Sequence, residues 1–119
     1  HRGSYRAYIT LRDEMLQQVT SLRKKYPGVS SILVTGHSMG AALSVYASSD
    51  LALAHRDLQV ILYAFGTPRP GDSAFNSFLR SQSNLHIWNV INGKDIVPQC
   101  GLYRPPFCNQ QWNGFQQID

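Results

Sequence analysis

The stretch Val34–Ser44, VTGHSMGAALS, carries the strongest structural signal in the chain. An apolar, β-rich run leads into it, and small residues typical of a tightly packed helix follow. Its centre, Gly36-His37-Ser38-Met39-Gly40, has the G-x-S-x-G pattern of a nucleophile elbow, in which a sharp strand-to-helix turn lifts a serine hydroxyl above the end of a sheet. We expect strained backbone at the serine, and we expect both glycines to relieve crowding because they have no Cβ. The amide that follows the serine, that of Met39, would face a developing oxyanion.

Helices and strands alternate on both sides of this turn. Ahead of it, apolar residues recur at three- and four-residue spacing over residues 4–26, which predicts an amphipathic helix that ends at Pro27-Gly28. The stretch 30–35 favours a strand, and residues 41 to about 55 favour a helix with a small-residue face.

The elements after this helix complete an α/β pattern. Residues 58–65, LQVILYAF, are almost continuously apolar, which is typical of a strand buried on both faces of a parallel sheet. A short helix around Phe75 follows, and residues 85–91 predict a third strand. This order predicts an α/β fold: a parallel sheet with helices on both faces, joined by right-handed crossovers.

Length and composition narrow the function classes. A chain of 119 residues with 43% hydrophobic and 15% charged residues is expected to form one globular domain. The net charge of +4 is scattered, so we expect no nucleic-acid partner. No apolar run is long enough to span a membrane, and no signal peptide is visible.

The two cysteines, Cys100 and Cys108, could close a small disulfide or remain thiols. Because the chain offers no further zinc ligands beside them, we expect no metal or other cofactor.

Three stretches together resemble a known family. In order along the chain, VTGHSMGAALS, FGTPRPGDSAF (65–75) and VINGKDIVP (90–98) are similar to signature segments of the class 3 lipases. This is the fungal triacylglycerol lipase and feruloyl esterase group of the α/β-hydrolase fold, and the opening HRGSY also resembles it. The resemblance covers residues 1–98. It implies a carboxylic ester hydrolase that takes acylglycerols or other esters. It is also compatible with a lipid–water interface in the parent protein and favours secretion over other locations, which the residues themselves leave open.

The acid of a serine triad has two candidates. In α/β-hydrolases the triad order is serine, acid, histidine. The family's D-I-V-P aspartate falls on Asp95, and from the residues alone Asp95 also follows the third strand, at the sheet edge that holds the serine. Asp72, which follows the second strand, is the alternative acid, although an aspartate there also suits the cap of the next helix.

The base has no convincing candidate among the four histidines. The family's catalytic histidine lies several tens of residues after the aspartate, whereas this chain ends 24 residues after Asp95. His37 adjoins the serine, but neighbouring side chains on such a turn point apart. His1 matches a position that the family does not use in catalysis. His55 is expected at a helix end, and His86 is expected within a strand.

We therefore expect residues 1–119 to be one domain, the central part of a lipase-like fold that lacks the N-terminal strands, the lid and the C-terminal histidine segment. The base would lie beyond Asp119, and this chain alone would turn over esters very weakly. A sheet cut short would also expose edge strands and promote self-association. The alternative reading is a lipase-like module without catalysis, which serves binding or structure.

Overall fold

The computed structural model describes residues 2–99, and Cys100 and Cys108 lie outside this range. Within it, helices and strands alternate as expected. The elements are α1 (Arg2–Lys25), β1 (Ser31–His37), α2 (Met39–Ala54), β2 (Gln59–Phe65), α3 (Ser73–Arg80), β3 (Leu85–Val90) and α4 (Ile96–Gln99). The predicted order of helices and strands is confirmed as far as β3, with boundaries that shift by up to two residues, and α4 is a further short helix that the sequence pattern did not predict.

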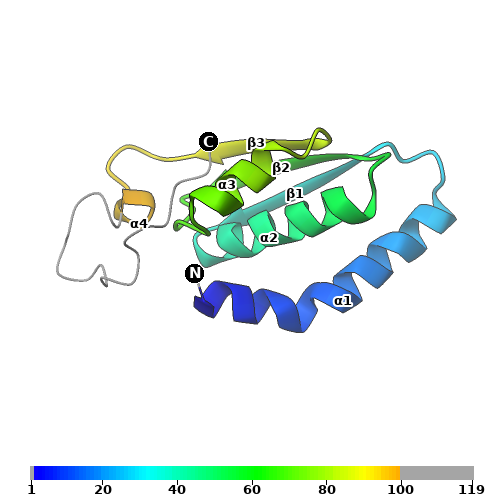
Figure 1. Cartoon of the computed structure of the whole chain (residues 1–119), viewed down its shortest axis with the longest axis horizontal. Helices are drawn as coiled ribbons and strands as arrows, with labels where there is room; N and C mark the ends of the chain where they lie inside the picture. Colours follow the sequence, from blue (N-terminus) through cyan, green and yellow to red (C-terminus); the bar gives the residue numbers. More distant parts are fainter. Residues whose placement is uncertain (1, 100–119) are drawn as a thin grey trace.

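The three strands form one parallel sheet in the order β1-β2-β3. His37 pairs with Phe65, and Phe65 pairs with Val90, so all three strands end at the same level. Figure 1 shows that the start of α2 and the short helix α4 both lie at this carboxyl edge. Any group that follows directly after a strand is therefore brought to one rim of the sheet.

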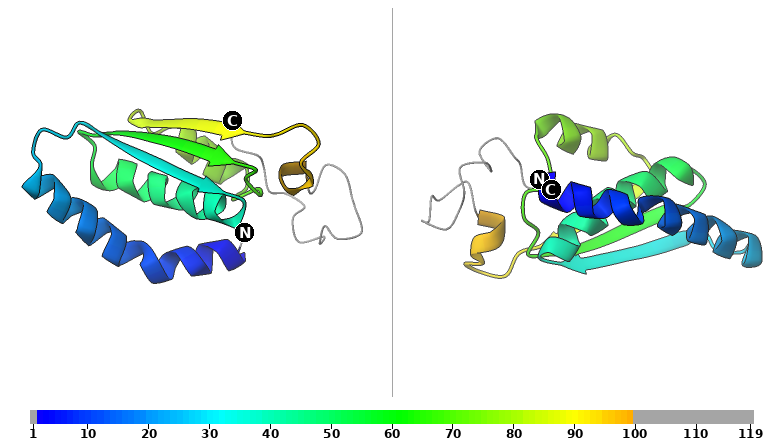
Figure 2. Two further views of the ribbon diagram at one scale, coloured as in Figure 1. Left: turned by 180° about the vertical axis from the view of Figure 1, so that it is seen from behind. Right: turned by 90° about the horizontal axis from the view of Figure 1, so that it is seen from below.

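The sheet is covered on one face only within residues 2–99. Along β2 the side chains alternate: Val60 and Leu62 are fully buried, whereas Tyr63 is 39% exposed. On the neighbouring strands, Leu33 and Trp88 face outward with exposed fractions of 67% and 58%. Seen from behind, no helix lies in front of the strands (Figure 2). The expected burial of residues 58–65 on both faces, and the expected second layer of helices, are not found in this part of the chain.

The direction of the crossovers explains why helices cover only one face of the sheet in this part of the chain. Right-handed β-α-β connections place their helices on one face when successive strands are added in the same direction. Because the strand order is β1-β2-β3, both α2 and α3 pack on the same side. Helices on both faces would require a reversal of strand order, which these three strands do not contain.

The core lies between the sheet and α2. Small residues of α2, Ala41 and Ala52, are fully buried against the sheet, and α1 packs beside α2 through Met15, Leu16 and Val19. At the far end from the rim, the buried Asn84 amide donates to the carbonyl oxygens of Ala52, His55 and Leu58 at 2.9–3.1 Å, which satisfies the C-terminus of α2. No helix in the described range is both long and apolar enough to cross a bilayer.

Candidate active site

The turn between β1 and α2 holds Ser38 in a strained conformation. Ser38 has φ 54° and ψ −123°, and no other non-glycine residue of the described chain has a positive φ. Its N–H donates to the Phe65 carbonyl at 2.9 Å, and its own carbonyl accepts from the N–H of Ala41 at 3.0 Å. These backbone bonds hold a conformation that L-residues rarely adopt, as the elbow pattern predicts.

Crowding around the turn is concentrated at Gly36. A Cβ there would press against the Ser44 Oγ and the Gly40 carbonyl oxygen, well inside van der Waals contact. At Gly40, a Cβ would meet no atom within 4 Å. The expectation that both glycines relieve crowding is therefore confirmed for Gly36 and wrong for Gly40, because the close approach of helix and strand occurs beside Gly36.

The start of α2 supplies an electropositive end beside the serine. Met39 is the first residue of α2, so its N–H belongs to the first turn, whose amides have no acceptor within the helix. The helix dipole adds partial positive charge at the same end. The Met39 side chain is 60% exposed and leaves this end of the helix open.

Asp95 lies at the same rim, five residues after the end of β3. Its Oδ1 accepts the N–H of Val97 at 3.0 Å, and its own N–H donates to the Asn92 carbonyl at 3.0 Å. Its Oδ2 accepts no hydrogen bond from another described residue and lies over the end of β2, beside Gly66. One carboxylate oxygen is thus held by the backbone, while the other remains available at the rim.

Asp72, the alternative acid, caps α3. Its Oδ1 accepts the Phe75 N–H at 2.9 Å in the geometry of a helix N-cap. The side chain is exposed at the start of α3. The helix-cap interpretation of Asp72 is confirmed.

Two of the histidines lie away from the rim. His55 follows the last residue of α2, so the full 16-residue helix, about 24 Å long, separates it from Ser38. His86 lies near the amino end of β3, where its Nε2 is 2.7 Å from Gln59 Oε1. His37 is at the rim, with its Nε2 directed toward Gly66, but the Ser38 hydroxyl has no hydrogen-bond partner among residues 2–99. His1 lies outside the described range.

His55 is buried in a small charged cluster instead. The Arg23 Nη1 lies 3.0 Å from His55 Nδ1, and Arg23 also pairs with Asp57. Since the guanidinium can only donate, Nδ1 must accept and the ring is neutral. Burial, reinforced by the charge of Arg23, lowers the pKa of His55 below its usual value. This histidine joins α1 to the end of α2 and is not placed for proton transfer at Ser38.

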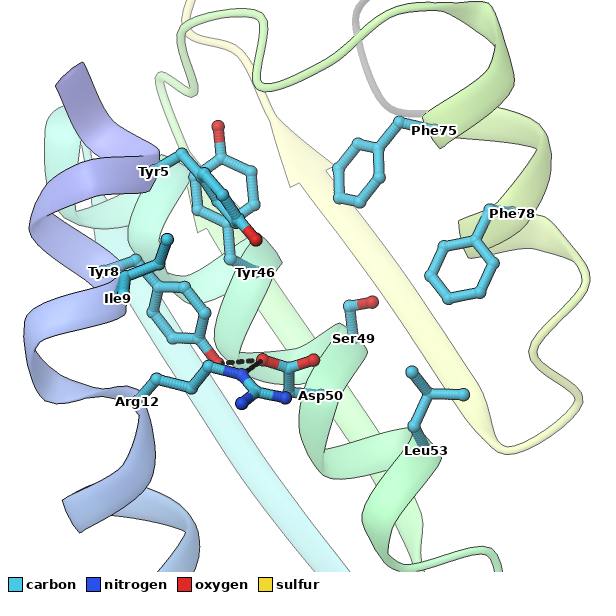
Figure 3. Close-up of a pocket in the computed structure, with 10 residues that line it drawn as sticks. All are labelled: Tyr5, Tyr8, Ile9, Arg12, Tyr46, Ser49, Asp50, Leu53, Phe75 and Phe78. Atoms are coloured by element: carbon cyan, nitrogen blue, oxygen red, sulfur yellow. Dashed lines mark hydrogen bonds and ion pairs between the residues drawn. The ribbon is translucent and has the colours of Figure 1, made fainter. Parts of the chain in front are cut away.

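A cleft lies between α1, α2 and α3, and neither Ser38 nor Asp95 is among its lining residues (Figure 3). It is a cleft of about 370 Å³ with five aromatic rings in its lining, those of Tyr5, Tyr8, Tyr46, Phe75 and Phe78.

Polar groups at one side of this cleft bind each other. Tyr8 Oη and Arg12 Nε each donate to Asp50 Oδ2 at 2.6 Å. Burial, with the hydrogen bond to Asp50, raises the pKa of Tyr8 above its usual range, and burial raises the pKa of Tyr46 to about 12. Both phenols therefore stay protonated donors at neutral pH. This cluster fastens α1 to α2. Nothing in the local sequence pattern indicates it, because its partners lie about forty residues apart.

No group of three or more His, Cys, Asp or Glu side chains within residues 2–99 is close enough to hold a metal ion. Among the described residues, the rim brings together a strained serine, a helix amide and a backbone-held carboxylate.

Sequence and structure comparisons relate the chain to known proteins. Residues 1–104 match the family model described as Lipase (class 3). The chain is 35% identical over 97 residues to a secreted mono- and diacylglycerol lipase of Malassezia restricta, covering 82% of this chain and 32% of the relative. It is 34% identical over 84 residues to phospholipase A1-IIbeta of Arabidopsis thaliana, covering 62% and 20%.

A solved structure shares the fold. It is a triacylglycerol lipase whose catalytic centre is described as a serine protease triad, with a TM-score of 0.76 and 31% identity over 83% of this chain and 38% of that one. The chain spans about a third of the length of the curated lipase relative.

Proposed function

The chain belongs to the class 3 lipase family of α/β-hydrolase fold, and we propose that the whole protein hydrolyses carboxylic esters with Ser38 as nucleophile and Asp95 as the acid of its triad. The observation that carries this proposal is the strained backbone of Ser38 at the rim of the sheet. Strain of this kind persists where surrounding structure maintains it for a function. Asp95, at the same rim, supports the assignment because one of its oxygens is fixed by the Val97 N–H while the other is available.

The proposed reaction proceeds through an acyl-enzyme. An imidazole base removes the Ser38 hydroxyl proton as Oγ attacks the ester carbonyl, and the carbonyl electron pair moves onto oxygen. The Met39 N–H, at the positive end of α2, stabilises this oxyanion. The tetrahedral intermediate then expels the alcohol, which takes the proton from the imidazolium. Water attacks the acyl-serine in the same way and releases the carboxylic acid.

The base is proposed to come from outside the described residues. His55 lies at the far end of α2, and His86 lies at the amino end of its strand, so neither reaches Ser38. A histidine from a segment after Asp119 would place its ring between Ser38 and Asp95, with Asp95 Oδ2 accepting the ring N–H. In this proposal, residues 1–119 are the central part of one lipase domain, which agrees with their share of the relative's length.

Acylglycerols are the proposed substrate class. The Malassezia restricta relative is named a secreted mono- and diacylglycerol lipase, and its match covers more of this chain than that of the plant phospholipase A1. By the same reasoning we propose that the whole protein is secreted and meets its substrate at a lipid–water interface. The elbow itself would serve phospholipids equally well, and hydrolysis of both ester classes distinguishes the two substrates.

Covalent labelling tests the nucleophile. The whole protein, encoded by its complete reading frame, is treated with a fluorophosphonate probe beside a Ser38→Ala variant. We expect labelling of the first and none of the second. Hydrolysis of diacylglycerol and phosphatidylcholine vesicles then separates the two substrate classes. Absence of labelling in a folded whole protein would overturn the proposal and favour a lipase-like binding module. Labelling that survives Ser38→Ala would reject Ser38 as the nucleophile.

A further inference from the structure

The peptide unit Phe65-Gly66 lies between the proposed nucleophile and the proposed acid. On one side, the Phe65 carbonyl accepts the Ser38 N–H at 2.9 Å; on the other, the Gly66 N–H donates to the Val90 carbonyl at 2.9 Å. This unit is where β2 ends, in the middle of the three strands. The elbow and the segment that carries Asp95 are thus both anchored to it.

Gly66 has two properties that only glycine combines readily. Its φ is +57°, in the left-handed region that side chains disfavour. A Cβ on Gly66 would also lie 2.7 Å from Asp95 Oδ2, closer than non-bonded carbon and oxygen atoms approach. The carboxylate therefore rests in the space that a side chain at position 66 would fill.

Asp95 Oδ2, the oxygen that a Cβ on Gly66 would contact, is the oxygen that the proposed reaction needs. Asp95 Oδ1 is engaged by the Val97 N–H, so Oδ2 is the oxygen left to accept the ring N–H of a histidine. A side chain at Gly66 would displace this oxygen in particular. We propose that Gly66 is a positioning residue for Asp95, a role that rests on the proposed function and acts only through the carboxylate.

The backbone at position 66 has little freedom to yield. Its N–H is bound to β3, the preceding carbonyl is bound to the elbow, and Thr67 and Pro68 directly after it are buried. The Asp95 side chain is only half-buried and belongs to the segment beyond β3. A Cβ at position 66 would therefore move Asp95 and leave the elbow in place. A displacement of about 1 Å at such a site can lower the rate by about 10²-fold.

The chain offers a matched control at Gly93. This glycine also has a left-handed φ, +52°, but a Cβ there would meet no atom within 4 Å. Gly93→Ala therefore introduces strain in the turn that precedes Asp95 but no contact on its carboxylate, whereas Gly66→Ala introduces similar strain together with that contact.

Four variants of the whole protein test the role: Gly66→Ala, Gly93→Ala, Asp95→Ala and the double variant Gly66→Ala/Asp95→Ala. Kcat and KM for a soluble ester are measured, with thermal unfolding of each variant.

We expect Gly66→Ala to lower kcat by about 10²-fold with little change in KM. Gly93→Ala should lower kcat less than Gly66→Ala, because its Cβ makes no contact with the Asp95 carboxylate. Asp95→Ala should lower kcat by about 10⁴-fold. The double variant should be no worse than Asp95→Ala, because the contact no longer exists.

Three results would overturn the positioning role: a Gly93→Ala loss as large as that of Gly66→Ala, a further loss in the double variant, or a loss in Gly66→Ala confined to KM. If Gly66→Ala fails to fold, Gly66→Asn, which tolerates the left-handed region, replaces it and should show the same dependence on Asp95. Full activity of Asp95→Ala would instead reject Asp95 as the acid, which is a failure of the proposed function, and the role of Gly66 would fall with it.

Discussion

The hydroxyl of Ser44 occupies the space that a side chain at Gly36 would need. Ser44 Oγ lies 2.9 Å from the Thr35 carbonyl oxygen and 2.8 Å from the Gly40 carbonyl oxygen, so one hydroxyl joins the end of β1 to the first turn of α2. The elbow is therefore held by local packing directly beneath Ser38, and alanine substitutions on its two sides should have opposite effects.

Gly36→Ala should lower the free energy of unfolding by about 1–3 kcal/mol, because the new Cβ overlaps backbone that cannot retreat. Gly40→Ala is the matched control. It lies in the first turn of α2 with open space around its Cα, and alanine is a better helix former than glycine by up to about 1 kcal/mol. Urea denaturation of the two variants checks this, and equal destabilisation would contradict the packing argument.

Ser38→Gly should stabilise the fold while it abolishes ester hydrolysis. Glycine reaches the strained φ and ψ of position 38 without the steric penalty of about 1–3 kcal/mol that a side chain incurs there. Glycine also gives the unfolded chain more freedom, so the net gain should be about 1 kcal/mol. Ser38→Ala keeps the Cβ and the strain and should show no such gain. A Ser38→Gly variant less stable than Ser38→Ala in urea would argue against strain at the elbow.

Tyr8→Phe should destabilise the chain more than Arg12→Met. The Tyr8 side chain is 3% exposed and donates to the charged Asp50, and a hydrogen bond of this kind contributes about 1.5–3 kcal/mol. The Arg12 side chain is 42% exposed, so water screens its ion pair with Asp50 and the loss should be smaller. Methionine keeps the apolar stem of Arg12. The reverse order of stabilities would show that the ion pair is the stronger contact.

Acidification should weaken the junction of α1 with the end of α2. The pKa of His55 is lowered in the folded state, mainly by burial and also by Arg23, so the unfolded chain binds a proton more readily. The stability that His55 contributes is therefore present above its unfolded pKa of about 6.5 and is lost as pH falls through the lower folded value. The free energy of unfolding should fall by at most about 1.4 kcal/mol per pH unit in this window.

His55→Gln is the control for this titration, since glutamine can accept from Arg23 but does not ionise near neutral pH. Its stability should change less than that of the unmodified chain between pH 7 and pH 5. The pKa of Asp57 is also lowered, through its hydrogen bond with Arg23, so the contribution of Asp57 is lost only at more acidic pH. An identical pH dependence for the two proteins would exclude His55 as the responsible group.

Leu33→Lys should reduce self-association of the 119-residue chain. Leu33 is 67% exposed on the uncovered face of the sheet, on a strand that pairs on one side only within the described range. Exposed apolar faces and free strand edges both favour association. Ser31→Lys adds the same charge on the same face without removing an apolar side chain. Sedimentation velocity should show a larger fall in average mass for Leu33→Lys, and equal effects would assign the change to net charge.

The parts of the fold that local sequence determines were predictable. The elbow follows from five consecutive residues around Ser38, and the helices and strands follow from periodicity over single segments. The uncovered sheet face was not predictable in this way, because apolar residues on both sides of residues 58–65 do not reveal which side a helix covers. That depends on the direction in which successive strands are added.

The candidate site also combines features that local sequence predicts with contacts that it does not predict. The position of Asp95 at the rim follows from its place after the third strand. Its contact with Gly66 joins residues 29 positions apart, and the contact of Tyr8 with Asp50 joins residues 42 apart. No spacing rule connects such pairs in a single sequence. The state of Cys100 and Cys108 stays a prediction, since both residues lie outside the described range.

The central place of β2 governs which insertions and deletions the molecule can absorb. An extra residue in the loops that precede β2 or follow α3 leaves the end of the strand where it is. One extra residue inside β2 would turn its inward side chains outward and shift Gly66 from beneath Asp95. Length variation among natural or laboratory-evolved versions of this domain should therefore accumulate in those loops, while the seven-residue length of β2 stays constant.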